Sequence, residues 1–141
     1  MLMIESLHHA SVPVSDLQRS RQFYEGILGL VEIPRPPFDF PGAWYDLGWG
    51  RQLHLIQDDR PQRSPTFRDG KGVDSRDIHF AVRVRDYREA LESLHSQGYR
   101  EDAEDDLKKI QNNPTGAAGF PQIYILDPDR NVIEINAASG H

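Results

Sequence analysis

The strongest constraint on the fold of this chain is an internal repeat, in which segments 7–30 and 78–99 read alike at an offset of 70 positions. Each segment opens with apolar residues at alternate positions, which predicts a strand with one buried face. These residues are Ala10, Val12 and Val14 in the first segment and Phe80, Val82 and Val84 in the second. A repeat of this length predicts two similar modules that each contain one supersecondary unit.

Each predicted strand is followed by a predicted helix. Asp16 and Asp86 stand at the same offset and can cap the first turn, because a short side-chain acceptor satisfies backbone N–H groups that have no helical partner there. Gly29 and Gly98 stand where each helix should end. The apolar residues between them follow helical spacing: Leu17, Tyr24, Ile27 and Leu28, then Tyr87, Ala90, Leu91 and Leu94.

Short strand-like runs complete each half of the chain and give the pattern βαβββ twice. They are residues 31–33, 43–47 and 52–57 in the first half and 122–126 and 131–137 in the second. The turns 48–50 and 127–130 are plausible hairpin connections. We therefore predict an α+β fold in which two βαβββ modules form a cleft-shaped mixed sheet. Residues 1–141 form one domain, with the first module at about 1–60, a linker at about 58–75 and the second module at about 76–138.

Three segments do not fit this pattern. Residues 34–41 are too rich in proline for a central strand and are expected to form a rim loop. Residues 58–75 are polar and contain proline and glycine, as expected of the linker. The acidic stretch 101–106 is compatible with a short helical turn or with a loop.

Composition excludes several classes of function. The chain has no cysteine, so disulfides, thiolate ligands and cysteine nucleophiles are excluded, and any metal must bind through nitrogen and oxygen. The net charge is -6, and no long basic block could follow a phosphate backbone, so we expect no nucleic-acid partner. No apolar run long enough for a membrane span and no signal-like leader are visible, so a cytoplasmic location is expected.

The alternation of side chains along the predicted strands places four potential metal ligands on the face opposite the apolar core. If Ala10, Val12 and Val14 point into the core, His9 points to the opposite face, and His79 does the same in the second module. His54 lies between two core leucines, Leu53 and Leu55, and Glu134 lies between Ile133 and Ile135. An offset of 80 aligns His54 with Glu134, so the four residues form two repeat-equivalent pairs.

Three imidazoles and one carboxylate suit a divalent first-row transition metal, with zinc, nickel, iron, manganese and cobalt as candidates. Such a metal would keep open positions for water or substrate. A single histidine on a strand is far more often a surface residue than a ligand, but four residues at matched positions are harder to dismiss. His8 has the opposite parity to His9, so we expect it to have a structural role.

The chain resembles the vicinal oxygen chelate superfamily, also called the glyoxalase, bleomycin resistance and dioxygenase superfamily, over almost its full length. The resemblance depends on His9-x4-Val14-x-Asp16-Leu17, on Ser20-x2-Phe23-Tyr24-x3-Leu28-Gly29-Leu30, on the strand with His79, and on Asp127-Pro128-Asp129-x-Asn131-x2-Glu134. It implies paired βαβββ modules, frequent homodimerisation and a metal in a U-shaped cleft. The implied metal ligands are His9, His54, His79 and Glu134.

The resemblance also implies an activity, for which alternatives are open. The leading hypothesis is a glyoxalase I-like lyase or isomerase that acts on a small oxygenated substrate, such as a glutathione or other thiol conjugate, with Glu134 moving a proton. Bacterial glyoxalase I enzymes usually have glutamate where this chain has His54. The alternatives are an extradiol-type dioxygenase or a thiol transferase that uses His9, His79 and Glu134, with His54 lining the cleft, and a noncatalytic bleomycin resistance-like binding protein. Arg83, Trp44 and Tyr124 are candidate substrate contacts.

Overall fold

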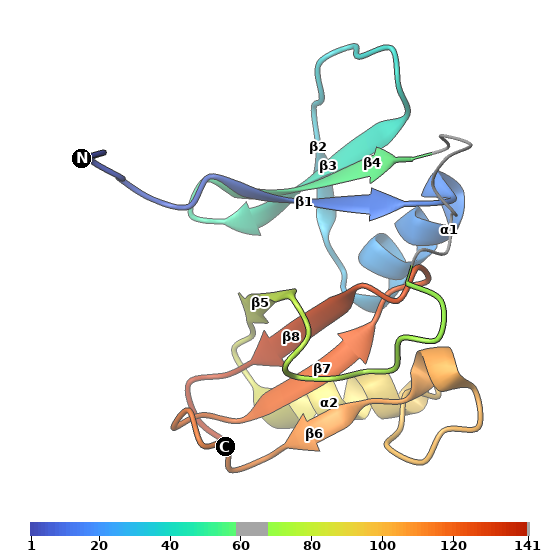
Figure 1. Ribbon diagram of the computed structural model, residues 1–141. Helices are drawn as coiled ribbons and strands as arrows, with labels where there is room; N and C mark the ends of the chain where they lie inside the picture. Colours follow the sequence, from blue (N-terminus) through green and yellow to red (C-terminus); the bar gives the residue numbers. More distant parts are fainter. Residues whose placement is uncertain (59–67, 141) are drawn as a thin grey trace. The chain divides into compact units, whose positions relative to one another are not determined.

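The computed structural model describes residues 1–58 and 68–140. The chain divides into two compact units, Met1–Pro65 and Thr66–His141, which we call the first and second modules and describe separately. The expected linker, 58–75, includes the boundary between these units in the sequence, and its residues 59–67 are outside the described residues. Both modules have the predicted βαβββ order, so the fold is α+β, as expected (Figure 1).

The first module is built on a four-stranded sheet with the order β1-β4-β3-β2. Strands β1 and β4 are parallel, and the other two pairs are antiparallel. Its elements are β1 (His9–Val14), α1 (Leu17–Arg21), η1 (Gln22–Ile27), β2 (Val31–Ile33), β3 (Gly42–Gly48) and β4 (Arg51–Gln57). The proline-rich segment 34–41 contains no strand, in agreement with the expected loop.

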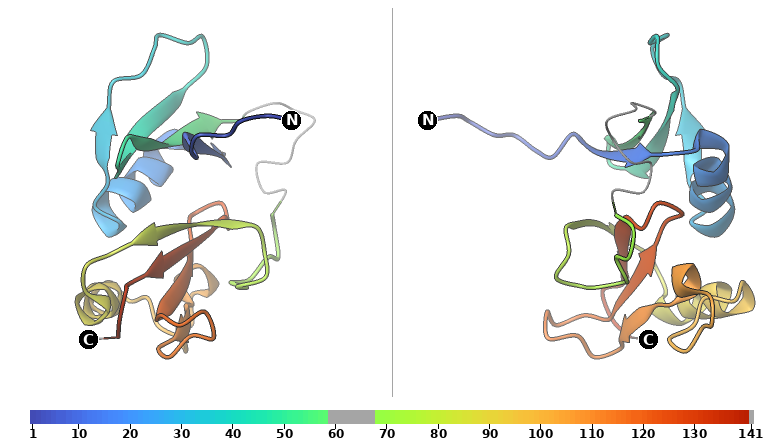
Figure 2. Two further views of the ribbon diagram at one scale, coloured as in Figure 1. Left: turned by 90° about the vertical axis from the view of Figure 1, so that its left-hand side faces the viewer. Right: turned by 45° about the vertical axis from the view of Figure 1, so that its right-hand side comes forward.

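The second module repeats this topology, with the sheet order β5-β8-β7-β6 and one parallel pair, β5 and β8. Its elements are β5 (His79–Arg83), α2 (Tyr87–Ser96), η2 (Asp106–Lys108), β6 (Gln111–Asn113), β7 (Gln122–Leu126) and β8 (Val132–Asn136). Helix α2 lies along one face of this sheet, as the two views of Figure 2 also show. The parallel pair therefore joins the first and last strands of each module.

The predicted helix boundaries are confirmed. The Asp16 carboxylate accepts a hydrogen bond from the Arg19 backbone N–H at 3.1 Å, and Asp86 accepts the equivalent bond from Glu89 at 3.0 Å. Gly29 has a φ of 69°, a left-handed conformation that glycine adopts without a steric penalty. The local signals at both ends of the helices thus determine where the chain leaves each strand and turns back.

Two details differ from the sequence-based prediction. The first helix was expected to continue regularly through Leu28, but α1 is short and is followed by the π-helical turn η1, in which the Leu28 N–H bonds to the Phe23 carbonyl at 3.2 Å. The predicted βαβββ order requires three strands after the second helix, but the sequence located only 122–126 and 131–137. The remaining strand is β6, whose three residues, Gln111–Asn113, are polar and carry no alternating pattern. In the acidic stretch 101–106, residues 101–105 contain no helix, and the short 3-10 helix η2 begins at the last residue, Asp106.

Alternating apolar residues form the core of each module, as the parity argument predicts. Leu53 and Leu55 on β4 are fully buried, and Ile133 and Ile135 occupy the equivalent positions on β8 with exposures of 0% and 5%. The opposite faces of these strands carry the polar residues discussed below. Within the described parts of the chain, no helix is both long enough and apolar enough to cross a membrane.

Candidate metal centre

In the first module, two histidines lie face to face on the parallel strands β1 and β4. Ser11 pairs with His54 in the sheet register, and His9 lies two residues before Ser11 on the same face. The two imidazole rings stack with their centroids 4.0 Å apart and an angle of 18° between their planes. The structure thus brings together the two ligands that the sequence predicts for this module.

His54 is held on its other side by Trp44, which pairs with it across β3 and β4. Their ring centroids are 3.9 Å apart and the planes differ by 3°, so His54 is stacked between Trp44 and His9. Its Nε2–H donates to the Gln52 side-chain oxygen at 2.8 Å, which leaves Nδ1 with a free lone pair. The orientation of this ring is therefore fixed by three neighbours.

Electrostatics keep His54 neutral. Burial lowers the pKa of His54 to about 4, and electrostatic interactions with His9, His8 and Arg35 act in the same direction. A neutral imidazole can donate its lone pair to a metal at neutral pH, whereas a protonated one cannot. The environment of His54 thus suits a metal ligand, and it equally suits a neutral aromatic wall.

His9 is exposed and is bound on one side by its neighbour His8. The two Nδ1 atoms are 2.8 Å apart, so one ring donates and the other accepts. This contact occupies Nδ1 of His9 and leaves Nε2 for another partner. His8, for which the sequence predicts a structural role, is thus the hydrogen-bond partner of His9.

In the second module, His79 and Glu134 form the equivalent pair on β5 and β8. Ala81 pairs with Glu134 in the register, which matches the pairing of Ser11 with His54. His79 Nε2 lies 3.1 Å from Glu134 Oε2. On the other side of the ring, Nδ1–H donates to the Asp77 backbone carbonyl at 2.8 Å, so Nε2 is the nitrogen that faces the carboxylate.

Two amide side chains support the carboxylate of Glu134. Gln122 and Asn136 both donate to Oε1, at 3.0 and 2.9 Å, which leaves Oε2 facing His79. Burial alone would raise the pKa of Glu134, but the hydrogen bonds from Asn136, Gln122 and His79 outweigh it and lower the pKa below its ordinary value. Glu134 is therefore ionised at neutral pH although only 6% of it is exposed.

The three candidate substrate residues have different environments. Trp44 and Tyr124 are repeat-equivalent, since each pairs across a hairpin with the second donor residue of its module. Tyr124 packs edge-on against His79, with the ring centroids 5.4 Å apart. Arg83, by contrast, donates to the Asn136 side-chain oxygen at 2.6 Å and lies over the Phe120 ring. Arg83 thus orients the amide that supports Glu134.

Sequence reasoning missed the residues that hold the donors. They are Gln52, Asp77, Gln122 and Asn136. Gln52 lies two residues from His54 and Asn136 two residues from Glu134, so each shares a sheet face with its donor. Gln122 pairs with Asn136 across β7 and β8, and this strand parity could have identified all three residues. The Asp77 contact is made by a backbone carbonyl in a loop, which no sequence pattern indicates.

The donor set fits a divalent transition metal. Imidazole nitrogens and an ionised carboxylate are preferred ligands of such ions, and the donors are oriented by hydrogen bonds of the kind found around metal ligands. Among the described residues, no three histidine, cysteine, aspartate or glutamate side chains lie close enough together to hold a metal ion. Each module contains one pair of the candidate donors, His9 with His54 and His79 with Glu134.

Comparison with known proteins gives consistent results. Residues 6–135 match the model of the family described as Glyoxalase/Bleomycin resistance protein/Dioxygenase superfamily. A relative named Glyoxylase I 4 from Arabidopsis thaliana is 27% identical over 135 residues, which cover 95% of this chain and 71% of the relative.

Solved structures show the same fold. A putative glyoxalase family protein from Bacillus anthracis aligns with a TM-score of 0.72 and 20% identity over 97% of this chain and 98% of its own. Lactoylglutathione lyase from Agrobacterium tumefaciens aligns with a TM-score of 0.65 and 16% identity over 95% and 94%. The fosfomycin resistance protein FosX from Listeria monocytogenes aligns with a TM-score of 0.64 and 19% identity over 96% and 94%.

Proposed function

Because this chain belongs to the Glyoxalase/Bleomycin resistance protein/Dioxygenase superfamily, we propose that it is a metal-dependent lyase or isomerase of glyoxalase type. Its substrate would be a small molecule with neighbouring oxygen atoms, such as a conjugate of glutathione or another thiol. The relative named Glyoxylase I 4, which is 27% identical to this chain, supports this assignment. The sequence-based expectations of a homodimer and a cytoplasmic location stay predictions.

One observation carries the proposal: both modules place two donor side chains at equivalent positions of a parallel strand pair. His9 and His54 stack in the first module, and His79 contacts Glu134 in the second. A surface histidine has no reason to recur with a partner at the same register. We propose that these four residues hold one divalent transition metal, which when bound would act as a Lewis acid on the substrate oxygens.

Glu134 is the proposed proton carrier. Its depressed pKa makes it a carboxylate at neutral pH, and the amides of Gln122 and Asn136 hold Oε1 so that Oε2 faces the site. In an isomerisation, Oε2 would leave the metal, accept a proton from one substrate carbon and return it to the neighbouring carbon, so no atom is gained or lost. Tyr124 and Trp44 would flank the substrate and limit the access of water.

A second candidate function is favoured by the environment of His54. Its ring is stacked between Trp44 and His9, and its Nε2 is bound to Gln52. A histidine held in this way can form part of the wall of the site, which leaves His9, His79 and Glu134 as ligands. That set of two histidines and one glutamate is the set expected for an extradiol-type dioxygenase or a thiol transferase.

The test begins with the metal content of untreated protein, followed by assays with methylglyoxal plus glutathione and with catechols under oxygen. We expect one bound transition metal per chain and turnover of the hemithioacetal. Glu134→Gln should abolish turnover, and His95→Gln, a histidine substitution on α2 away from the donors, should not. Oxygen uptake with catechols would instead support the second candidate. A protein that binds no transition metal would contradict both.

A further inference from the structure

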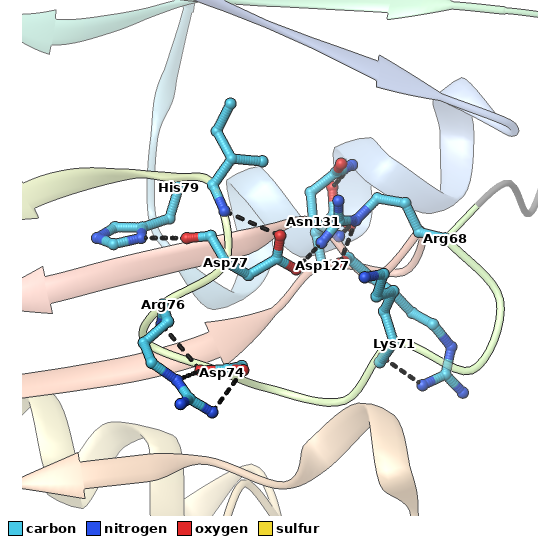
Figure 3. A network of polar contacts seen from close by, with 10 residues as sticks. Arg68, Lys71, Asp74, Arg76, Asp77, His79, Asp127 and Asn131 are labelled. Atoms are coloured by element: carbon cyan, nitrogen blue, oxygen red, sulfur yellow. Dashed lines mark hydrogen bonds and ion pairs between the residues drawn. The ribbon is translucent and has the colours of Figure 1, made fainter.

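The loop before β5 contains a buried ion pair that contacts the proposed metal ligand His79. The guanidinium of Arg68 bonds to the carboxylate of Asp77, and the side chains are only 10% and 17% exposed (Figure 3). Asp77 makes three further hydrogen bonds: its Oδ1 accepts the Ile78 N–H at 2.8 Å, its backbone carbonyl accepts Nδ1–H of His79 at 2.8 Å, and its backbone N–H donates to the Asp74 carbonyl at 3.1 Å. The conformation of Asp77 therefore decides where the hydrogen-bond acceptor of His79 lies.

Arg68 also reaches the turn that precedes β8. Its Nε donates to the Arg130 carbonyl at 2.7 Å, and Arg130 lies in the β7–β8 turn with a φ of 67°. The Arg130 side chain is anchored in turn by Asp106 at 2.6 Å and by the Lys71 carbonyl at 2.9 Å. Arg68 thus connects Asp77, two residues before the start of β5, to the turn before β8, the strand of Glu134.

The chemistry of arginine explains why this residue suits the position. A guanidinium presents several N–H donors in a fixed planar fork, so it can bond a carboxylate and a carbonyl together. A buried aspartate without its partner would be an uncompensated charge, which is strongly unfavourable. Removal of Arg68 should therefore move Asp77 toward solvent and take its carbonyl away from His79.

We propose that Arg68 is a positioning residue, which through Asp77 holds the ring of His79 with Nε2 facing Glu134. The functional meaning of this arrangement depends on the proposed metal site, because a ligating histidine is commonly oriented by a hydrogen bond on its other ring nitrogen. The geometry itself is independent of any metal. It can therefore be tested separately from the proposed function.

The first test uses the metal-free protein. We expect ¹H–¹⁵N NMR to show a His79 Nδ1–H resonance that exchanges slowly with solvent, identified by its loss in His79→Gln. This resonance should be lost or exchange at least about tenfold faster in Arg68→Met. The matched control is Arg76→Met, because Arg76 lies in the same loop and pairs with Asp74, but this ion pair is exposed. Absence of the resonance in the unaltered protein, or equal exchange in Arg68→Met, would overturn the proposal.

The second test measures zinc affinity by calorimetric titration. We expect Arg68→Met to weaken zinc binding by roughly 10- to 100-fold, as losses of ligand-supporting contacts do, and Arg76→Met to leave it unchanged. Failure of the unaltered protein to bind zinc would count against the proposed function, while the NMR result would still decide the role of Arg68.

A third variant covers the case in which Arg68→Met does not fold. Arg68→Lys keeps the charge beside Asp77, but a single ammonium group lacks the fork that bonds Asp77 and the Arg130 carbonyl together. We expect this variant to fold and to show an exchange rate of the His79 Nδ1–H between those of the unaltered protein and of a fully exposed ring. Exchange as slow as in the unaltered protein would overturn the proposed bridging role.

Discussion

The two modules place their donors at equivalent positions but surround them differently. In the first module, His54 is stacked between two rings and is kept neutral by burial. In the second, Glu134 occupies the equivalent position as an ionised carboxylate, supported by two amides and by His79. The same strand arrangement therefore surrounds the donors with aromatic rings in the first module and with a network of polar side chains in the second.

This difference shows that one face of the repeated strands is constrained by the core, whereas the side chains on the other face differ between the modules. The inward faces of β4 and β8 keep apolar residues at matched positions, since the sheet must be covered there. The outward faces carry different chemistry at the same register, because a change of side chain there does not disturb the core. The two modules thus present a neutral and an anionic donor at equivalent positions of the same fold.

The largest predicted effect tests whether the two cores are equivalent. Leu53→Ala and Ile133→Ala remove repeat-equivalent side chains that are both fully buried, so we expect each to lower the free energy of unfolding by about 3–4 kcal/mol. Urea titration of each variant measures this loss. Ile56→Ala on β4 is the control, because Ile56 is 36% exposed and its truncation should have a much smaller effect. A large loss in one module and almost none in the other would show that the cores are not equivalent.

Most of the fold could be predicted from the sequence, because alternation, caps and glycines act over short distances. The helix starts at Asp16 and Asp86 follow from local hydrogen bonds. The π-helical turn at Gln22–Ile27 could not be predicted, since its residues keep an ordinary helical pattern and the shift depends on the i to i−5 bond at Leu28. Strand β6 was missed because pairing with β7, and not composition, makes Gln111–Asn113 a strand.

The candidate site was predicted in part. Strand parity was enough to pair His9 with His54 and His79 with Glu134 within their modules, because adjacent parallel strands present the same faces. The assignment of Arg83 as a substrate contact took no account of Asn136, which accepts its hydrogen bond in the structure. The role of Asp77 depends on a backbone carbonyl, whose direction is set by the tertiary contact with Arg68.

The second prediction concerns pH and distinguishes His54 from Glu134 in the metal-free protein. The pKa of His54 falls from 6.5 to about 4 on folding, so below pH 6.5 the unfolded chain takes up a proton that the folded chain does not. Stability is therefore lost as the pH falls from about 6.5 to 4, by at most about 3 kcal/mol. The pKa of Glu134 is lowered from 4.5, so its contribution is complete above that pH and is lost only below it.

Urea midpoints measured between pH 7 and pH 4 test this difference. We expect His54→Gln to flatten the loss of stability between about pH 6.5 and 4.5, and Glu134→Gln to leave the slope in that window unchanged. His95→Gln serves as the control for removal of a histidine. An unchanged slope in His54→Gln would show that the burial of this ring is not what makes the first module sensitive to acid.

The smallest predicted effect compares the two hairpin turns, each of which places a non-glycine residue in the left-handed region. Trp49 has a φ of 57° and is 94% exposed, so Trp49→Gly should relieve backbone strain and raise the free energy of unfolding by about 0.5–1 kcal/mol. Arg130, at 67°, bonds Asp106 and the Lys71 carbonyl through its side chain. Arg130→Gly should therefore lower stability by about 1 kcal/mol despite the same relief, and Arg130→Ala by about 2 kcal/mol, because it keeps the strain. Changes of the same sign in both glycine variants, measured by urea titration, would show that the Arg130 contacts contribute less than its backbone strain.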